Sequence, residues 1–305
     1  MTSGCRSSKG GFVLIAVLMV TVLFLGAAVS FATFARSQIR RASDEEFALR
    51  ARSLAVIACG FVSELIAGDN NGYDSPREVF YSPEAVLLLP FGDWEVNIGI
   101  MPQDALIPIN TPFLPDGVTV RQEYEHLWSQ VWTLLGASNA GVLALDFLDA
   151  DVEPRVGSRE DGYFPNKKIS DMSEFLRLPE IEPELLYGSS SDLGLNNFFT
   201  VRGEESINVN VAPREVLAVL DPDLGPDAAD AIIVYREDND IKSASDLNKI
   251  PGLSPAAVAR LDKILTGGSN YFLVRIGVRY ENNERNFVIL LKRGGAKCQV
   301  VNWRE

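Results

Sequence analysis

The longest hydrophobic pattern in the chain is an uninterrupted apolar run near its start. No charged residue occurs between Lys9 and Arg36, a gap of 26 residues. A helix needs about 20 apolar residues to cross the hydrocarbon core of a membrane, whereas a cleaved secretion signal has an apolar core of only about 7–15 residues. The run therefore predicts a transmembrane helix over residues 12–35. Basic residues flank it on both sides, so the positive-inside rule does not fix its orientation.

A helical pattern continues beyond the apolar run, over residues 36–67. Apolar residues recur there at intervals of three, four and seven, and no proline or glycine interrupts them before Gly60. The sequence AGDNNG at 67–72 ends the pattern. From Phe12 to Ala67 the predicted helix is roughly 84 Å long. This length predicts a stem that continues the membrane helix into water; a plain anchor with a linker helix is the simpler alternative.

Strand patterns occur at both ends of the remaining chain. The segment DWEVNIGI at 93–100 alternates apolar and polar residues, and EAVLLLP before it is a suitable partner. The segments 270–280 and 286–293 read as two further strands, and ENNER between them is typical of a hairpin. Helical patterns fill 121–148 and 212–265 between these two groups of strands.

The separated strands predict an α+β fold with an insertion. Because strands at both ends must find partners, we expect the long N-terminal helix to pack on a small antiparallel, pilin-like sheet, with a large, mostly helical domain inserted between strands. The alternative is two consecutive domains. The predicted parts of the soluble region are the first part of the sheet, the insert, and the second part of the sheet with a tail, at 68–110, 111–266 and 267–305.

Charge and composition exclude several functions. The formal net charge is −13, which disfavours nucleic acid or an anionic lipid surface as the main partner. The chain has one histidine, His126, so Ser-His-Asp, Cys-His and histidine-rich metal sites have almost nothing to be built from. We therefore expect no enzymatic activity.

One motif in the second helical block resembles a helix–hairpin–helix unit. In IPGLSPAAVARL, residues 251–253 form the turn, Ser254 caps a helix and Pro255 takes its first position. Such hairpins often bind DNA phosphates. Residues 212–265, however, carry six basic and ten acidic residues, the wrong sign for a phosphate-binding surface. We expect a structural or protein-contacting module, and a membrane-anchored DNA-binding or DNA-uptake protein is the alternative.

The leader resembles a class III, type IV prepilin-like signal: a short basic segment ends in glycine and is followed by Phe12 and the apolar helix. In that family a prepilin peptidase cuts after the glycine and N-methylates the new terminus. The resemblance implies cleavage between Gly11 and Phe12, removal of residues 1–11 and retention of the membrane helix. Most pilins carry glutamate at the fifth mature position; this chain has Ala16 there.

The missing glutamate favours a particular place in a filament. A carboxylate in lipid is costly unless it is paired, and in the family's filaments it faces the N-terminal amine of the subunit above. A subunit at the tip has no such neighbour, so Ala16 is compatible with the tip. The K component of type II secretion (general secretion pathway protein K) is a minor pseudopilin family that lacks this glutamate.

Motifs from about residue 146 to 278 resemble that family in content and order. They are DFLDADVEPRVGSREDGYF, EFLRLPEI, FFTVRG, SINVNVAPREVL, IPGLSPAAV and SNYFLVRIGV. The resemblance implies a non-enzymatic minor pseudopilin at the tip of the type II secretion pseudopilus. It implies a single span in the bacterial inner membrane, a cytoplasmic N-terminus and a periplasmic bulk. Its expected partners are other minor pseudopilins, the prepilin peptidase, and secreted cargo or the outer-membrane secretin, and no nucleic acid.

An acidic segment follows the first helical block and is a candidate calcium site. Its candidate ligands are Asp149, Asp151, Glu160 and Asp161. Oxygen ligands at alternating positions suit calcium, although the glycine and terminal glutamate of an EF-hand are missing. The family resemblance also implies calcium in this region. The alternative is an acidic loop or an ion-pair cluster with Arg155 and Arg159.

Two of the three cysteines stay on the mature chain. Cys5 would leave with the leader, and Cys59 and Cys298 would face an oxidising compartment. A disulfide between them would join the C-terminal tail to the stem. The alternative is a buried Cys59 and an exposed, free Cys298.

Overall fold

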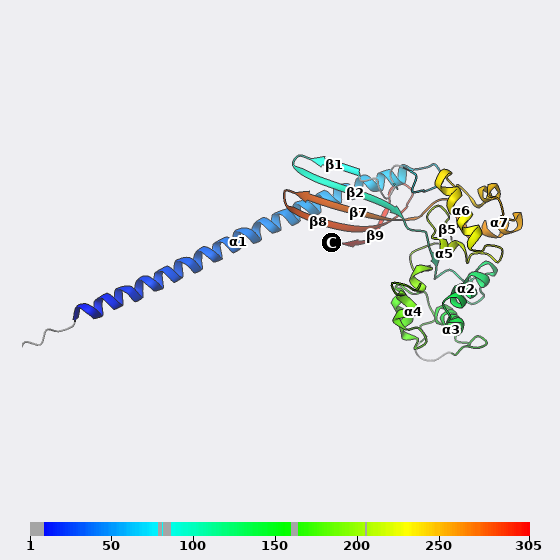
Figure 1. Ribbon diagram of the computed structural model, residues 1–305, viewed down its shortest axis with the longest axis horizontal. Helices are drawn as coiled ribbons and strands as arrows, with labels where there is room; N and C mark the ends of the chain where they lie inside the picture. The colour runs from blue at the N-terminus through cyan, green and yellow to red at the C-terminus, as the bar shows by residue number, and fades with distance from the viewer. Residues whose placement is uncertain (1–8, 79–80, 82–86, 160–163, 205) are drawn as a thin grey trace, which may run out of the picture. The chain divides into compact units, whose positions relative to one another are not determined.

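One long helix forms the N-terminal part of the chain. α1 runs from Lys9 to Gly68 without a break (Figure 1), which confirms the predicted helix through the apolar run and the stem. The computed structural model describes residues 9–78, 81, 87–159, 164–204 and 206–305. The chain divides into two compact units, Met1–Leu54 and Ala55–Glu305, so each unit is described by itself.

In the first unit, α1 is apolar enough to cross a membrane. Its most apolar window has a mean hydropathy of 2.9 and no side chain of that window is buried in the protein. The hydroxyl of Thr21 donates to the carbonyls of Val17 and Leu18 at 3.0 and 2.8 Å, and that of Thr33 donates to Ser30 at 2.8 Å. These side chains therefore need no water, and the helix meets the requirement that polar groups in lipid are satisfied internally.

The second unit contains an antiparallel sheet of five strands in the order β1-β2-β7-β8-β9. The strands are β1 (Leu87–Phe91), β2 (Trp94–Pro102), β7 (Tyr271–Tyr280), β8 (Asn283–Lys292) and β9 (Gln299–Arg304). In β2 every second side chain, Val96, Ile98 and Ile100, is buried. The register sets Val96 opposite Val278 and Ile98 opposite Ile276, so apolar residues of neighbouring strands share one face.

The last turns of α1 run along this sheet (Figure 1). Ala55, Ala58, Val62 and Ile66 are fully buried at three- and four-residue spacing, so small side chains let the helix approach closely. Larger residues on the same segment lie on the other side: Ile57 is 55% exposed and Phe61 is 43% exposed. This end of the stem is therefore apolar on both sides: Ala55, Ala58, Val62 and Ile66 are buried, and Ile57 and Phe61 stay exposed.

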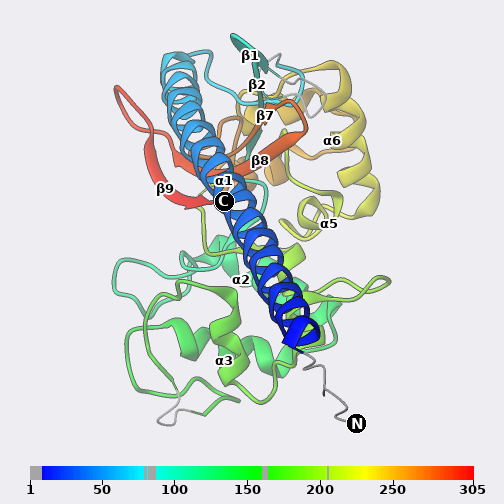
Figure 2. The same ribbon diagram turned by 90° about the vertical axis from the view of Figure 1, so that its left-hand side faces the viewer.

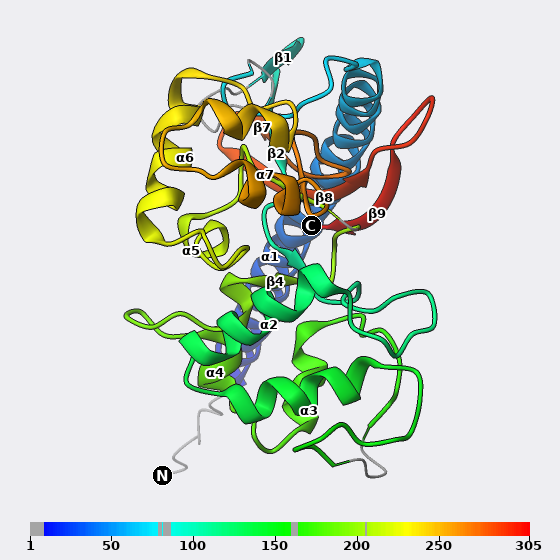
Figure 3. The ribbon, with the colours of Figure 1, turned by 90° about the vertical axis from the view of Figure 1, so that its right-hand side faces the viewer.

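All of the chain between β2 and β7 forms the insert, in two lobes (Figure 3). One lobe has β3 (Ile107–Pro108), α2 (Gln122–Leu134), α3 (Ser138–Leu148), η1 (Met172–Arg177), α4 (Pro183–Tyr187), η2 (Leu195–Asn197) and β4 (Phe199–Thr200). The other has β5 (Ile207–Asn208), α5 (Arg214–Leu217), α6 (Pro226–Asp238), η3 (Ala244–Lys249), α7 (Pro255–Leu261) and β6 (Leu265–Thr266). The inserted arrangement, not two consecutive domains, is confirmed.

Two features at the edges of the insert and sheet differ from the sequence pattern. β3 pairs in parallel with β4, and Ile107 and Ile109 lie in the core of the insert, so the insert starts nearer Pro102 than the predicted 110/111 boundary. The tail expected after the second hairpin strand forms β9, which pairs with β8.

The hairpin motif folds as its residues predict. Ser254 accepts a hydrogen bond from the backbone N–H of Ala257 at 3.1 Å, and Pro255 is the first residue of α7. Gly252 has φ 93°, which an L side chain rarely adopts, so the turn requires glycine.

Substitutions at two helical glycines, one at the contact of α2 with α3 and one away from it, test how these helices pack. A Cβ on Gly141 would lie 2.6 Å from Cγ of the buried Trp132, whereas a Cβ on Gly60, also helical, would have nothing within 4 Å. We expect Gly141→Ala to lower the unfolding free energy by about 1–3 kcal/mol through overpacking. Gly60→Ala should be neutral or raise it by up to about 1 kcal/mol through helix propensity. Thermal denaturation monitored by tryptophan fluorescence measures both, and equal midpoints for the two variants would contradict this packing.

Candidate functional site

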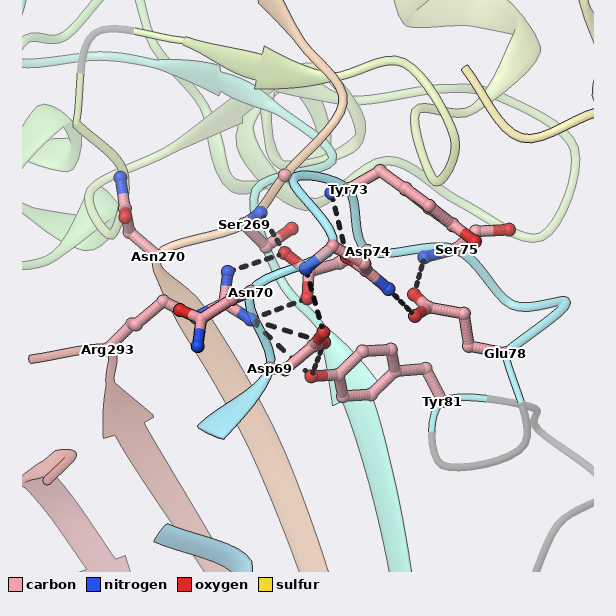
Figure 4. A network of polar contacts seen from close by, with 12 residues as sticks. Asp69, Asn70, Tyr73, Asp74, Ser75, Glu78, Tyr81, Ser269, Asn270 and Arg293 are labelled. Carbon is pink, nitrogen blue, oxygen red and sulfur yellow. Dashed lines mark hydrogen bonds and ion pairs between the residues drawn. The ribbon is translucent and has the colours of Figure 1, made fainter. Parts of the chain in front are cut away.

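A polar loop joins the end of α1 to the sheet and the insert (Figure 4). Short polar side chains shape it locally: Asn71 accepts from the N–H of Tyr73 at 3.0 Å, and Glu78 accepts from the N–H of Ser75 at 2.9 Å and from the Asn71 amide. Asn, Asp, Gly and Ser favour such turns because their side chains bond nearby backbone groups.

Asp74 is the central residue of this network, and it is fully buried. Its carboxylate accepts two hydrogen bonds from Arg293, at 2.9 and 2.7 Å, and one from the N–H of Ser269 at 2.6 Å. Arg293 follows the last residue of β8, and its guanidinium also lies over the ring of Phe272, 4.9 Å from the centroid. A bidentate pair of this kind fixes both direction and distance, so it attaches the loop after α1 to the end of the sheet.

The insert is attached at the same place. The amide of the buried Asn208 donates to the carbonyl of Asp74 at 2.9 Å and to the hydroxyl of Ser269 at 2.8 Å. The N–H of Asp74 donates to Gly267 at 2.8 Å. We call Asp74, Asn208, Ser269 and Arg293 the junction network, because they link the helix, the sheet and the insert.

Three carboxylates, of Asp69, Asp74 and Glu78, approach one another within 4.8 Å at this place. The phenol of Tyr81 donates to Asp69 at 3.0 Å, and burial raises its pKa, with the charges of the two aspartates adding to the effect. Burial also raises the pKa of Glu78. A cation suits such a cluster, and the guanidinium of Arg293 is that cation, 3.8 Å from Asp69 and paired with Asp74. The ion pairs of this cluster therefore hold the loop after α1 against the end of the sheet.

Asp104 lies where the chain leaves β2 and enters the insert. Its Oδ2 accepts from the backbone N–H of Tyr271 at 2.9 Å and from that of Asn270, so it bridges the start and the end of the insert. Its Oδ1 is buried, and no residue in the described part of the chain makes a hydrogen bond to it. Burial raises the pKa of Asp104 to about 6, against the opposing effect of the two N–H groups.

The predicted acidic segment is partly a buried ion-pair cluster. Asp149, one of the predicted ligands, is 1% exposed and pairs with Arg155 at 2.8 Å; Asp146 is fully buried and pairs with the same arginine at 3.0 Å. Asp151 accepts a bond from the N–H of Glu153 at 3.0 Å. The other predicted ligands, at 160 and 161, lie outside the described residues.

The cluster around Arg155 leaves negative charge uncompensated. Two buried carboxylates share one guanidinium, and Oδ1 of Asp149 has no hydrogen-bond partner among the described residues. Burial raises the pKa of Asp149 to about 6 even though Arg155 lowers it. Arg159 pairs with Glu180. The predicted ion pair with Arg155 thus forms, the one between Arg159 and the acidic segment stays a prediction, and the donor set suits a hard cation.

The two cysteines predicted to pair lie close together as free thiols. Cys298 donates its backbone N–H to the hydroxyl of Ser63 at 2.8 Å, and its thiol lies 3.6 Å from the carbonyl oxygen of Ser63. Ser63 is one turn beyond Cys59 on α1. Burial raises the pKa of both thiols, so they are less reactive than an ordinary cysteine, and their pairing stays a prediction.

The processing residues lie at the start of α1. The peptide bond between Gly11 and Phe12 is part of the helix, and the side chain of Phe12 is 77% exposed. Ala16 stands one turn later, in a segment without any ionisable residue before Arg36. Cleavage and methylation at this bond stay predictions.

Comparison with known proteins supports the resemblance on two levels. Residues 207–265 match the family described as Type II secretion system (T2SS), protein K. The fold is similar to that of a chain in the crystal structure of the GspK-GspI-GspJ complex from the enterotoxigenic Escherichia coli type 2 secretion system. That likeness has a TM-score of 0.57 and covers 88% of this chain and 98% of the other. At 17% identity it establishes the fold alone.

No curated protein matches the chain in sequence. The matched family segment is β5 to β6, which contains the hairpin motif and the buried Asn208 of the junction network. The family match and the shared fold together confirm the resemblance to the K component of type II secretion that the sequence motifs indicate.

Asp104 gives a prediction on pH dependence. Its folded pKa of about 6 lies above the ordinary 3.8, so the folded state binds more protons than the unfolded state between these values. The stability contributed by the protonated Asp104 carboxyl is therefore complete below about pH 4 and is lost as the pH rises through 6, on the order of 3 kcal/mol.

Asp104→Asn keeps an oxygen for both N–H donors and cannot ionise. We expect it to unfold at the same temperature as the wild type at pH 4 and at a higher temperature at pH 7.5. The control Asp238→Asn, at the exposed end of α6, should follow the wild-type profile. A wild-type advantage over Asp104→Asn at pH 7.5 would show that the buried carboxylate is stabilised as an anion.

Proposed function

We propose that the chain is a minor pseudopilin of the type II secretion pseudopilus and stands at its tip. The observation that carries the proposal is the protein K family segment at 207–265, placed within an insert between strands of a helix-and-sheet fold. The span at 12–35 anchors it in the bacterial inner membrane, with the N-terminus in the cytoplasm and the second unit in the periplasm. Its work is assembly and not catalysis.

The stem supports a role in a filament. Val56, Ile57 and Phe61 are exposed on α1, at 55%, 55% and 43%, while Ala55 and Ala58 of the same helix are buried. Exposed apolar side chains at helical spacing gain free energy, about 25 cal/mol per Å², when a neighbouring helix covers them. We infer that this face contacts the stems of other minor pseudopilins, as the I and J components.

Two features favour the tip over a place within the filament. Ala16 provides no carboxylate to pair with the amine of a subunit above. The insert adds two lobes to the sheet domain (Figure 3), which hinders stacking of another subunit and offers a surface to cargo or to the outer-membrane secretin. The prepilin peptidase would act before assembly, at the bond between Gly11 and Phe12.

The arginines of the hairpin region weigh against DNA binding. Arg214 pairs with Asp230, and Arg260 pairs with Asp221 and Asp223 at 2.7 Å each. Arg236 donates to the backbone carbonyls of Val209 and Ala212. These guanidinium groups are thus engaged within the fold, and phosphate would have to displace carboxylates to reach them.

The processed membrane protein tests the proposal. We expect the chain extracted from membranes of its own host to begin at an N-methylated Phe12, by intact mass and N-terminal sequencing, and to co-purify with the I and J components. Intact Met1, or a cut after Ala28 or later, would overturn the pilin class. Correct processing without I and J would remove the minor pseudopilin role. Salt-sensitive micromolar binding to duplex DNA, by fluorescence polarisation, would favour the DNA-binding alternative.

We also propose that the acidic segment binds calcium. Asp149 and Asp151 would hold the ion, with Glu160 and Asp161 as the other predicted ligands, and calcium would supply the positive charge that Arg155 alone does not provide. Calcium at about ten times its Kd would raise the unfolding free energy by about 1.4 kcal/mol.

Thermal melting with calcium and with chelator tests this site. We expect calcium to raise the midpoint of the wild type, but not that of the double variant Asp149→Asn/Asp151→Asn. The double variant Asp227→Asn/Asp238→Asn, which removes two exposed carboxylates from α6, should keep the wild-type shift. No shift in the wild type, or an equal shift in the Asp149/Asp151 variant, would remove calcium from this segment.

A further inference from the structure

The two lobes of the insert, lobe 1 from β3 to β4 and lobe 2 from β5 to β6, are closed by the same kind of strand pair (Figures 2 and 3). In each lobe the first strand pairs in parallel with the last. Two N–H groups at the first strand, two residues apart, donate to two carbonyls of the last, also two residues apart. These bonds are Ile107 to Phe198, Ile109 to Thr200, Ile207 to Ile264 and Val209 to Thr266, at 2.8, 2.9, 2.8 and 3.0 Å.

An asparagine after each first strand makes the same two hydrogen bonds. In lobe 1, the side chain of Asn110 donates to the carbonyl of Ile169 at 2.9 Å and accepts from its N–H at 2.9 Å. In lobe 2, the side chain of Asn210 donates to the carbonyl of Ile241 at 2.8 Å and accepts from its N–H at 3.0 Å. The partners are 59 residues apart in lobe 1 and 31 in lobe 2, so local sequence does not account for the agreement.

The segments that begin at these two isoleucines align without a gap. They are ISDMSEFLRLPEIEP at 169–183 and IKSASDLNKIPGLSP at 241–255. Each contains a 3₁₀ helix, η1 or η3, a proline two residues after it, and then a helix with proline at its first position, α4 or α7. The apolar positions of the core also correspond: Phe175 with Leu247, Leu178 with Ile250 and Ile181 with Leu253.

A carboxylate in the first turn of each 3₁₀ helix has the same role. Glu174 accepts from the N–H groups of Ser170 and Asp171 at 2.7 and 3.3 Å. Asp246 accepts from those of the corresponding residues, Lys242 and Ser243, at 2.9 and 3.4 Å. The strand pair, the asparagine, the aligned segment and this carboxylate recur in the same order, which is typical of a repeated supersecondary unit.

The two lobes differ at two places. After Ile207, lobe 2 has Asn208 of the junction network, which bonds to Asp74 and Ser269. Lobe 1 has Pro108 at that position, which has neither a backbone N–H nor a polar side chain. The second difference is a connection: residues 149–168 separate α3 from the isoleucine of lobe 1, whereas only residues 239–240 separate α6 from that of lobe 2.

We propose that the insert consists of two copies of one module: lobe 2, which is the protein K family segment at 207–265, and lobe 1 at 107–200. Lobe 2 attaches the insert to the sheet and to the loop after α1. In lobe 1, residues 149–168 are a loop added to the module, and this loop carries the acidic segment. Loops held by a rigid scaffold often form binding sites. The role of the loop as a cation site rests on the calcium site proposed above, but the two-copy relation does not.

An exchange of hairpins tests the two-copy relation. Lobe 1 takes the hairpin of lobe 2 by four substitutions, because the prolines of the two segments already match: Leu178→Ile, Glu180→Gly, Ile181→Leu and Glu182→Ser. The exchange gives up one partly exposed ion pair, of Glu180 with Arg159. We expect the full chain in detergent to melt within about 4 °C of the wild type.

The control for the exchange has the same four residue types at the same positions in another order: Leu178→Gly, Glu180→Ile, Ile181→Ser and Glu182→Leu. We expect it to lower the melting midpoint by about 8 °C or more, because it removes the two buried apolar side chains of the hairpin. Equal midpoints of the exchange variant and this control would overturn the two-copy relation.

An insertion tests whether residues 149–168 are an added loop. The recognition sequence of a site-specific protease is placed between Val156, which is fully exposed, and Gly157, where φ is 88°. We expect the insertion to be tolerated, as exposed loop positions usually are. After cutting, the two pieces should stay together in size-exclusion chromatography and melt within about 4 °C of the uncut chain.

The matched control has the same sequence inserted between Asn239 and Asp240, in the short connection of lobe 2. It should lower the midpoint before any cutting, because this connection has no spare chain. Separation of the pieces cut in lobe 1, a lower midpoint of the cut chain, or equal tolerance of both insertions would overturn the added loop. A wild type whose midpoint does not respond to calcium would remove the cation role of the loop and leave the two-copy relation to the hairpin exchange.

Discussion

The buried pair of Asp74 and Arg293 is the interaction on which the architecture of the second unit depends. The two residues are 219 positions apart, and they connect the loop after the helix with the end of a central strand. Removing one partner of a buried ion pair typically costs about 3–5 kcal/mol, because the other charge is left buried. Ser269 also donates to the carboxylate of Asp74, and Asn208 donates to its backbone carbonyl. The helix, the sheet and the insert therefore meet in one fixed geometry.

Local patterns in the sequence were enough for most of the fold. The uninterrupted apolar run, the alternation in β2 and the cap at Ser254 each depend on neighbours in the chain, and each element formed where it was predicted. The insertion followed from one topological requirement, that separated strands need partners. β9 was not predicted, because VVNW is short and follows two glycines, and it becomes a strand only by pairing with β8.

The candidate sites were harder to predict, since their partners are distant. Nothing in the sequence near Asp74 indicates Arg293, and nothing near Asp104 indicates the N–H groups of Asn270 and Tyr271. For the acidic segment the residue types indicated both a cation site and ion pairs, and the structure shows that Arg155, nearby in sequence, is one counter-ion. The stem has the predicted helical period, but the period alone did not show that Ala55 and Ala58 are buried together with Val62 and Ile66 while Phe61 is directed outward.

The position of the insert within the sheet also affects how the protein folds. Pro102 pairs with Phe272, so the central strand pair cannot close until the whole intervening chain has been brought together. Loop closure of this length costs entropy, and topologies dominated by such distant contacts fold slowly. A collapsed insert shortens the effective loop, which favours an order in which the lobes form first and the sheet closes around them. The β1–β2 hairpin, made earlier in synthesis, would wait as an incomplete sheet until β7 arrives, and in that interval its open side is exposed to pairing with other chains.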